Sequence, residues 1–227
     1  MTDRLRLHMV LYITHELEIQ VNNENAELNL VYVDDVVASF IEKLHIKSDD
    51  NYFEIVTTYK KTLAQIKELL YKFKSSRDTL LVPQVGSGFE RAMYGTYLSY
   101  LPTERFSYEL KGHKDDRGTF YEMLKTERSG QVSISTTAPG ITRGGHYHHT
   151  KNEKFLVIKG KAVIQLRNIL NEEIIEYNVS DEKMEVVEMI PGYTHNIKNI
   201  GEDELILLLW ANENYDKTAP DTYFLEV

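Results

Sequence analysis

The spacing of apolar runs changes near Pro102, and this change most restricts what the chain can fold into. After it, short β-prone runs recur about every 8–12 residues between glycine, proline and asparagine turns, which is typical of an all-β sandwich or barrel. Strands are predicted over 105–111, 118–125, 131–137, 153–159, 161–167, 173–179, 184–190, 195–200 and 204–210. Because closure into a jelly roll leaves few exposed edges, we expect one such domain over residues 102–227.

The preceding residues, 1–101, alternate strand and helix instead. An apolar run over 28–33 ends at Asp34, a favoured helix N-cap, and residues 36–44 carry apolar side chains on one helix face. A further strand is predicted over 52–57. Thr62 and Gln65 have the spacing of a capping box for a helix over 62–73, and a short helix is predicted over 89–98. We therefore predict an α+β chain whose first part is a partial α/β segment.

Composition narrows the classes of function. The 227 residues include no cysteine, which excludes a disulfide scaffold, a thiolate metal site and an iron–sulfur cluster. The net charge is −9, without the basic patch of a nucleic-acid binder. No apolar run approaches the ~20 residues that span a bilayer, and the start lacks the cleavage site of a signal peptide. We expect a cytoplasmic protein with no nucleic-acid or membrane partner.

Three histidines and one glutamate have the spacing of metal ligands. His146 and His148 are separated by one residue, so on a strand both imidazoles point to the same side. Glu153 can return from the next strand, and His195 stands beside a proline–glycine turn. Three imidazoles and a carboxylate suit a borderline divalent ion such as zinc, iron, nickel or manganese, and zinc is the first candidate.

This spacing resembles the cupin signature G-x5-H-x-H-x4-E-x6-G. Every fixed position is matched, by Gly140, His146, His148, Glu153 and Gly160. The second cupin motif is matched at Gly192, His195 and Asn199, although its proline stands one place late and its leading glycine is absent. The resemblance implies a small β-barrel with one metal held by His146, His148, Glu153 and His195.

A second resemblance, to the dTDP-4-keto-6-deoxy-sugar 3,5-epimerases, overlaps the first. These enzymes are also cupin-shaped. The residues that match their segments are Arg117, Phe120, Glu122, Arg143, His146, Lys154 and Tyr215. The epimerases normally lack the metal ligands, so His146 is left as base, as ligand, or as both in different states.

Epimerisation of a keto sugar removes a proton from a carbon atom beside the ketone. It needs a base on one face, positive charge near the developing enolate, and an acid on the other face. The resemblance implies His146 as the base and Lys154 or the metal at the enolate oxygen. Tyr215 is then the acid that returns the proton.

The resemblance also implies a substrate-binding set. The guanidinium forks of Arg117 and Arg143 match the oxygens of a diphosphate. Phe120 and Glu122 complete the set. The expected small-molecule partner is therefore a UDP-sugar, and the expected protein partner is a second copy, because two-fold dimers are the commonest oligomers.

Residues 15–227 together resemble the CapF-type bifunctional enzymes of capsular polysaccharide synthesis, shortened at the N-terminus. Residues 30–37 and 88–102 look like late segments of an extended short-chain dehydrogenase. The resemblance implies, in full-length relatives, an NADPH-dependent reductase joined to a cupin that epimerises C3 of a UDP-4-keto-6-deoxy-N-acetylhexosamine toward UDP-N-acetyl-L-fucosamine. This chain has no glycine-rich dinucleotide fingerprint, so we expect no nucleotide cofactor site and no reductase activity.

Three functions remain open from the sequence. The first is a metal-containing 3-epimerase. The second is an inactive or sugar-nucleotide-binding remnant whose metal is structural. The third is a metal-dependent oxygenase, because many cupins bind iron.

Overall fold

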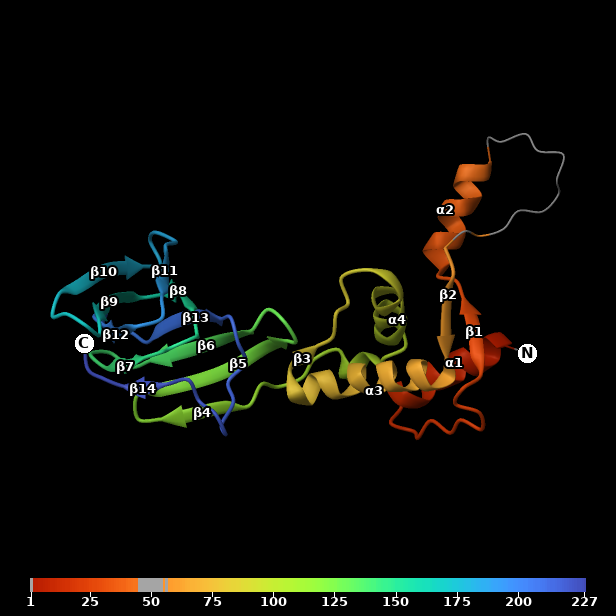
Figure 1. Ribbon diagram of the computed structural model, residues 1–227, viewed down its shortest axis with the longest axis horizontal. Helices are drawn as coiled ribbons and strands as arrows, with labels where there is room; N and C mark the ends of the chain where they lie inside the picture. The colour runs from red at the N-terminus through yellow and green to blue at the C-terminus, as the bar shows by residue number, and fades with distance from the viewer. Residues whose placement is uncertain (1, 45–54, 56) are drawn as a thin grey trace. The chain divides into compact units, whose positions relative to one another are not determined.

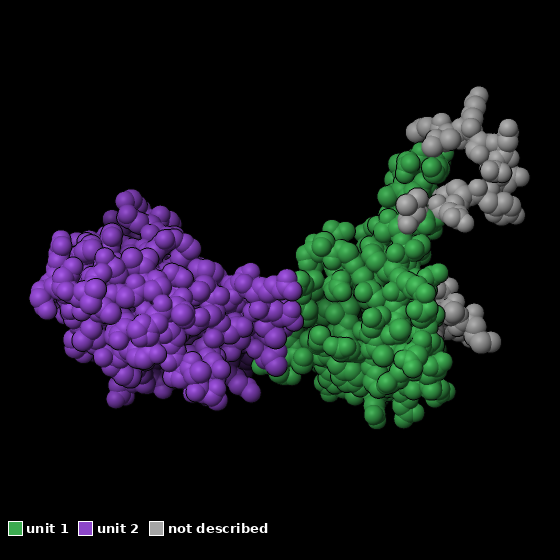
Figure 2. Space-filling view, viewed as in Figure 1, with its two compact units in different colours: residues 1–78, 83–108 green, residues 79–82, 109–227 purple. Residues whose placement is uncertain are grey.

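The computed structural model describes residues 2–44, 55 and 57–227, and the chain forms two compact units (Figures 1 and 2). Unit 1 lies within residues 1–78 and 83–108, and unit 2 comprises residues 79–82 and 109–227. None of the described helices has both the length and the apolar character needed to cross a bilayer.

Unit 1 combines helices with a two-stranded antiparallel sheet. Its elements are α1 (Thr2–Thr14), β1 (Glu27–Leu30), α2 (Val33–Lys43), β2 (Tyr59–Thr62), α3 (Leu63–Thr79), α4 (Gly88–Ser99) and a 3-10 turn, η1 (Thr103–Arg105). The predicted capping box is confirmed at the start of α3. The Thr62 amide donates to Gln65 Oε1 at 2.9 Å, and the Gln65 amide donates to Thr62 Oγ1 at 3.2 Å.

Helix α2 corrects one prediction and leaves another open. The helix begins at Val33 after Tyr32, so Asp34 is not its N-cap but lies in the first turn, where its charge suits the positive end of the helix. The strand predicted over 52–57 lies mostly outside the described residues, and β2 is instead the strand that pairs with β1. The predicted helix over 89–98 is present as α4.

Unit 1 has a hydrophobic core of its own. Ile13 of α1, Leu70 and Phe73 of α3, and Tyr97 of α4 are all buried to 1% exposure or less. The Phe73 ring lies 5.7 Å from that of Tyr97, centroid to centroid. The apolar residues of α3 recur with the 3.6-residue period of a helix, so their side chains lie on one face and pack into this core.

Unit 2 is a jelly roll of two packed sheets (Figure 1), antiparallel except where β3 pairs in parallel with β5, which confirms the predicted fold class. Its strands are β3 (Leu81–Val82), β4 (Gly112–Asp115), β5 (Gly118–Thr126), β6 (Gln131–Thr137), β7 (Thr142–Tyr147), β8 (Glu153–Lys159), β9 (Lys161–Asn168), β10 (Ile174–Ser180), β11 (Val186–Met189), β12 (Tyr193–Asn199), β13 (Leu205–Ala211) and β14 (Tyr223–Phe224). One sheet has the order β10-β9-β12-β7-β14, and the other has β11-β8-β13-β6-β5-β3 with β4 beside β5.

The start of unit 2 differs from the prediction. Residues 105–111 form no strand, since η1 ends at Arg105 and pairing begins only at Gly112, opposite Tyr121 of β5. Phe106 and Tyr108 are 64% and 51% exposed, so their apolar character does not mark a buried strand face. Apolar content alone misled the prediction here, because a strand also needs a partner for its backbone groups.

The inner surface of unit 2 changes from apolar to polar across the two sheets. Val157, Ile164, Ile197 and Leu207 belong to its buried core. On β6, in contrast, the residues that alternate inward are Gln131, Ser133, Ser135 and Thr137, all buried. The inward face of β6 is therefore lined with hydrogen-bonding groups along its length, which is unusual for a core and typical of a site.

Candidate metal centre

Four side chains of unit 2 converge as metal ligands would. Each of His146, His148, Glu153 and His195 offers one ligand atom, and these atoms all lie within 4.8 Å of one another. His146 is on β7 and His195 opposite it on β12, while His148 follows β7 and Glu153 begins β8. Two strands and the start of a third thus bring together residues far apart in sequence.

Gly144 permits the close approach of β7 and β12 beside this cluster. Its φ of +106° lies in a region that glycine adopts readily. A Cβ at this position would lie 2.5 Å from the backbone oxygen of His195. The register between these strands also shifts between His195 and Asn196, where Gly145 is the extra residue of a bulge on β7.

The hydrogen bonds of His148 leave one of its ring nitrogens facing a carboxylate. Its Nδ1 meets the backbone carbonyl oxygen of Asp221, which only accepts hydrogen bonds, so Nδ1 carries the ring proton. Its buried Nε2 lies 3.4 Å from Glu153 Oε2 and finds no hydrogen-bond partner among the described residues. In the neutral ring, two lone pairs then face each other, and a cation between them satisfies both.

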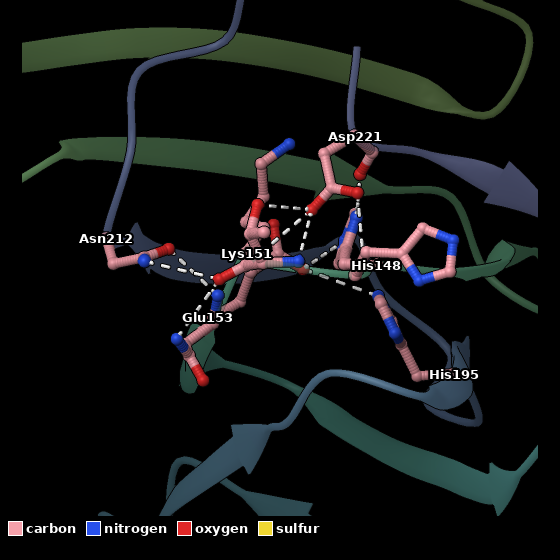
Figure 3. Close-up of polar contacts among 9 residues, drawn as sticks. His148, Lys151, Glu153, His195, Asn212 and Asp221 are labelled. Carbon is pink, nitrogen blue, oxygen red and sulfur yellow. Dashed lines mark hydrogen bonds and ion pairs between the residues drawn. The ribbon is translucent and has the colours of Figure 1, made fainter.

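His195, Glu153 and His146 also have the positions or charge states that a metal ligand needs. His195 Nε2 is also 3.4 Å from Glu153 Oε2 (Figure 3). Burial raises the pKa of Glu153, but the neighbouring His148 and His195 rings lower it more, so the group stays a carboxylate. Burial, together with His195 and His148, lowers the pKa of His146 to about 4, so this ring is neutral at pH 7. Neutral imidazoles and a carboxylate are the forms that bind metal.

A cavity of about 340 Å³ opens beside the cluster. Its lining includes His146, Glu153 and His195 together with three of the predicted substrate-binding residues, Arg117, Phe120 and Arg143. Burial lowers the pKa of Arg143, whose Nη1 donates to the carbonyl oxygen of Thr136 at 3.1 Å. Arg117 forms an ion pair with Asp115 at 2.6 Å, and its hydrogen bonds lower the pKa of Asp115 to about 2.

Three of the predicted residues are not brought into this group. Lys154 follows Glu153 on β8 and therefore points to the other side of the sheet, where its ammonium pairs with Glu188. Glu122 pairs with Lys125 at 2.8 Å. Tyr215 is 47% exposed, and its ring lies 5.9 Å from the Lys151 ammonium.

The structure adds residues near the C-terminus that the sequence did not indicate. Thr222 and Phe224 line the cavity, and β14 pairs with β7 so that Phe224 lies opposite His146. The Asp221 carboxylate accepts the amides of residues 149–151; these bonds outweigh burial and hold its pKa well below the ordinary value. No local motif marks this segment, because its contacts are with residues about 70 positions earlier.

One residue of the second cupin motif is structural. Asn199 is fully buried, and its Nδ2 donates to the carbonyl oxygens of Thr137 and Asp203 at 2.8 and 2.9 Å. Its Oδ1 accepts the amide of Gly201. The residue therefore fixes the turn between β12 and β13 and does not take part in the cluster.

Comparisons with known proteins agree with this architecture. The polysaccharide biosynthesis C-terminal domain family matches residues 113–223. A UDP-2-acetamido-2,6-beta-L-arabino-hexul-4-ose reductase of Pseudomonas aeruginosa is 49% identical over 216 residues, which are 95% of this chain and 58% of that protein. The spore coat polysaccharide biosynthesis protein SpsL of Bacillus subtilis is 24% identical over 123 residues, or 50% of this chain and 82% of SpsL.

A crystal structure of the capsular polysaccharide assembling protein CapF of Staphylococcus aureus superposes on the chain with a TM-score of 0.91 at 49% identity. The match covers 97% of this chain and 60% of that one. The chain thus spans about six-tenths of the length of its CapF-type relatives. Over the part of these proteins that it spans, the chain belongs to the family of CapF-type capsular polysaccharide synthesis proteins.

Proposed function

We propose that unit 2 is a metal-containing cupin that epimerises C3 of a UDP-4-keto-6-deoxy-N-acetylhexosamine in capsular polysaccharide biosynthesis, on the way to UDP-N-acetyl-L-fucosamine. One observation carries the proposal. The cluster of three histidines and a glutamate borders a cavity that Arg117 and Arg143 also line. A bound metal and a phosphate-binding surface would therefore share one cavity, as a reaction on a sugar nucleotide requires.

The names of the relatives support the class of substrate. The Pseudomonas relative is named as a reductase of a UDP-linked hexul-4-ose, which is a sugar with a ketone at C4. That ketone acidifies the hydrogen at C3. The chain spans 58% of that relative, so the proposal does not include the reductase activity, and NADPH is assigned to full-length relatives alone.

His146, His148, Glu153 and His195 would hold a divalent ion such as zinc, which would supply positive charge near the enolate oxygen. His146 lines the cavity, and its pKa of about 4 leaves a lone pair at neutral pH to ligate the ion or accept the C3 proton. The opposite face of C3 then takes a proton from a solvent-exchangeable acid. Lys154 is left out of this scheme, because it points to the outer side of β8.

Arg143 and Arg117 are proposed to bind the diphosphate. Burial lowers the pKa of Arg143, because its charge is only partly exposed to solvent. A diphosphate entering the cavity would restore that lost solvation with charge-assisted hydrogen bonds. Arg117 presents a second guanidinium, oriented by Asp115. Phe120 lines the same cavity as an apolar wall.

Deuterium exchange tests the proposal. The purified chain, loaded with zinc, is incubated in D2O with the UDP-linked 4-keto sugar, and deuterium at C3 is measured by mass spectrometry. We expect incorporation that disappears with EDTA and in His148→Ala. Tight binding of the sugar nucleotide without exchange would instead support the alternative, a binding remnant with a structural metal. Oxygen uptake after addition of iron would contradict both and favour an oxygenase.

The proposed assembly is a homodimer. On the outer face of the larger sheet, an apolar row crosses five strands in register: Tyr121, Ile134, Leu208, Leu156 and Val186. A second copy of this face would be self-complementary about a two-fold axis. Light scattering should then give twice the 26.4 kDa chain mass, and a single monomer peak would reject the dimer. Val186→Glu should shift the mass to monomer, whereas Ile175→Glu on the other sheet should not.

A further inference from the structure

The Asp221 carboxylate holds the backbone of the loop that follows β7. Its Oδ1 accepts the amide of His149 at 2.9 Å, and its Oδ2 accepts the amides of Thr150 and Lys151, both at 2.8 Å. Thr150 Oγ1 donates to the same Oδ2 at 3.0 Å. Figure 3 shows Asp221 beside this loop, with His148 at the loop's start. One carboxylate thus satisfies three consecutive backbone amides.

The same residue contacts a metal ligand through its backbone. The carbonyl oxygen of Asp221 accepts a hydrogen bond from His148 Nδ1. Side chain and main chain of one residue therefore hold the loop and the ring together. On the far side of the loop, Asn152 and Asn212 exchange hydrogen bonds of 2.8 and 3.1 Å, so the loop is held from two directions.

We propose that Asp221 is a positioning residue for His148: its carboxylate anchors residues 149–151, and its carbonyl keeps the imidazole proton on Nδ1, so that the Nε2 lone pair points at the cation site beside Glu153. The inference deepens the proposed function and rests on it only where a metal is concerned. The position of the ring proton is a property of the metal-free chain as well.

The chemistry of the ring makes this contact consequential. A neutral imidazole carries one proton, and only the nitrogen without it ligates a metal. If the carbonyl shifts away from Nδ1 once the carboxylate no longer holds residue 221 to the loop, the proton is free to occupy Nε2 and donate to Glu153, only 3.4 Å away. In that tautomer Nε2 has no lone pair for the metal, so His148 cannot act as a ligand. Loss of a comparable outer partner of a metal-bound histidine typically costs about 10–100-fold in metal affinity.

The remaining C-terminal contacts support a fixed position for Asp221. The Leu225 amide donates to the carbonyl oxygen of Gly145 at 3.0 Å, and Thr194 Oγ1 donates to the carbonyl oxygen of Leu225. Arg167 Nη2 donates to the Glu226 carbonyl at 2.6 Å. The segment after Asp221 is thus tied to β7, β9 and β12, whereas residue 221 itself is held by the bonds of its carboxylate to residues 149–151.

The test compares Asp221→Ala with Asp216→Asn in the full chain. Asp216 is a control in the same segment, because its carboxylate accepts local bonds from Thr218 and Ala219. Zinc affinity is measured by competition with a chelator. The tautomer of His148 is measured in the metal-free chain by nitrogen-15 NMR. For Asp221→Ala we expect affinity lower by about 10–100-fold and a mixture of the two tautomers, with the control unchanged.

Asp221→Asn is the second variant, used also if Asp221→Ala does not fold. Its amide oxygen keeps one acceptor, so it should recover part of the affinity and of the Nδ1-protonated form. An unchanged His148 tautomer in folded Asp221→Ala would overturn the inference whatever the zinc affinity, and so would a fully wild-type tautomer and affinity in Asp221→Asn if only that variant folds. If the wild-type chain binds no metal, the proposed function fails, but the NMR comparison still decides the role of Asp221.

Discussion

His146 on β7 and His195 on β12 are register partners, and their ring centroids lie 4.6 Å apart. The contact depends on how closely the two strands approach, because β7 reaches the cluster through two consecutive glycines. A change in the strand separation should therefore alter both metal binding and the stability of the jelly roll. Gly144 and Gly140 allow the effect of this close approach on stability to be measured without metal.

Gly144→Ala should destabilise unit 2 more than Gly140→Ala. Both glycines have positive φ, which costs an alanine about 1–2 kcal/mol. An added Cβ at Gly144 would lie 2.5 Å from the backbone oxygen of His195, whereas an added Cβ at Gly140 would have no atom within 4 Å. Overpacking adds about 1–3 kcal/mol. Thermal unfolding without metal measures the difference, and equal losses in the two variants would contradict the account.

Glu153→Gln should remove metal binding and metal-dependent stability together, because the glutamate is the one anionic ligand of the cluster. At free metal 100-fold above Kd, the wild type gains about 2.7 kcal/mol, or about 5–10 °C in melting temperature for a chain of this size. Calorimetry with and without zinc measures this gain. Glu188→Gln, on the outer side, is the control and should keep it. Metal loss without a change in melting temperature would mean that the ion contributes nothing to folding.

The metal-free chain should lose stability as pH falls from about 6.5 to about 4. The pKa of His146 is lowered to about 4, so in this window the unfolded chain binds a proton that the folded ring does not. The lowered pKa of Glu153 acts in the same direction below its ordinary value. Melting temperatures of EDTA-treated protein between pH 7.5 and 4.5 should therefore decline. His146→Asn should flatten the slope and exposed His113→Gln should not, and a flat wild-type profile would refute the assignment.

Arg143→Lys should impair exchange, and Lys154→Ala should not. Arg143 lines the cavity, whereas Lys154 pairs with Glu188 on the outer face. Loss of a charged hydrogen bond typically costs about 1.5–3 kcal/mol, which is about a 10–100-fold loss of kcat/KM for the UDP-sugar. Initial rates of deuterium incorporation at several UDP-sugar concentrations give kcat/KM for each variant. An inactive Lys154→Ala with normal metal content would restore the catalytic role first expected for this lysine.

Local signals predicted much of the fold. The capping box at Thr62 and Gln65 and the strand over 131–137 involve neighbours in sequence, and the structure contains both. The strand expected over 105–111 is absent, because its apolar side chains find no partner strand. The assignment of residues 1–101 and 102–227 to separate domains stays a prediction.

The sequence by itself determined the set of metal-ligand candidates, since alternation along a strand places His146 and His148 on one side and fixed spacing adds Glu153. It did not determine which neighbours share that side with them. Only the tertiary structure turned Lys154 outward, brought Phe224 opposite His146 and placed the Asp221 carbonyl on His148. These contacts depend on strand register and on chain segments some 70 residues apart, which no short-range pattern encodes.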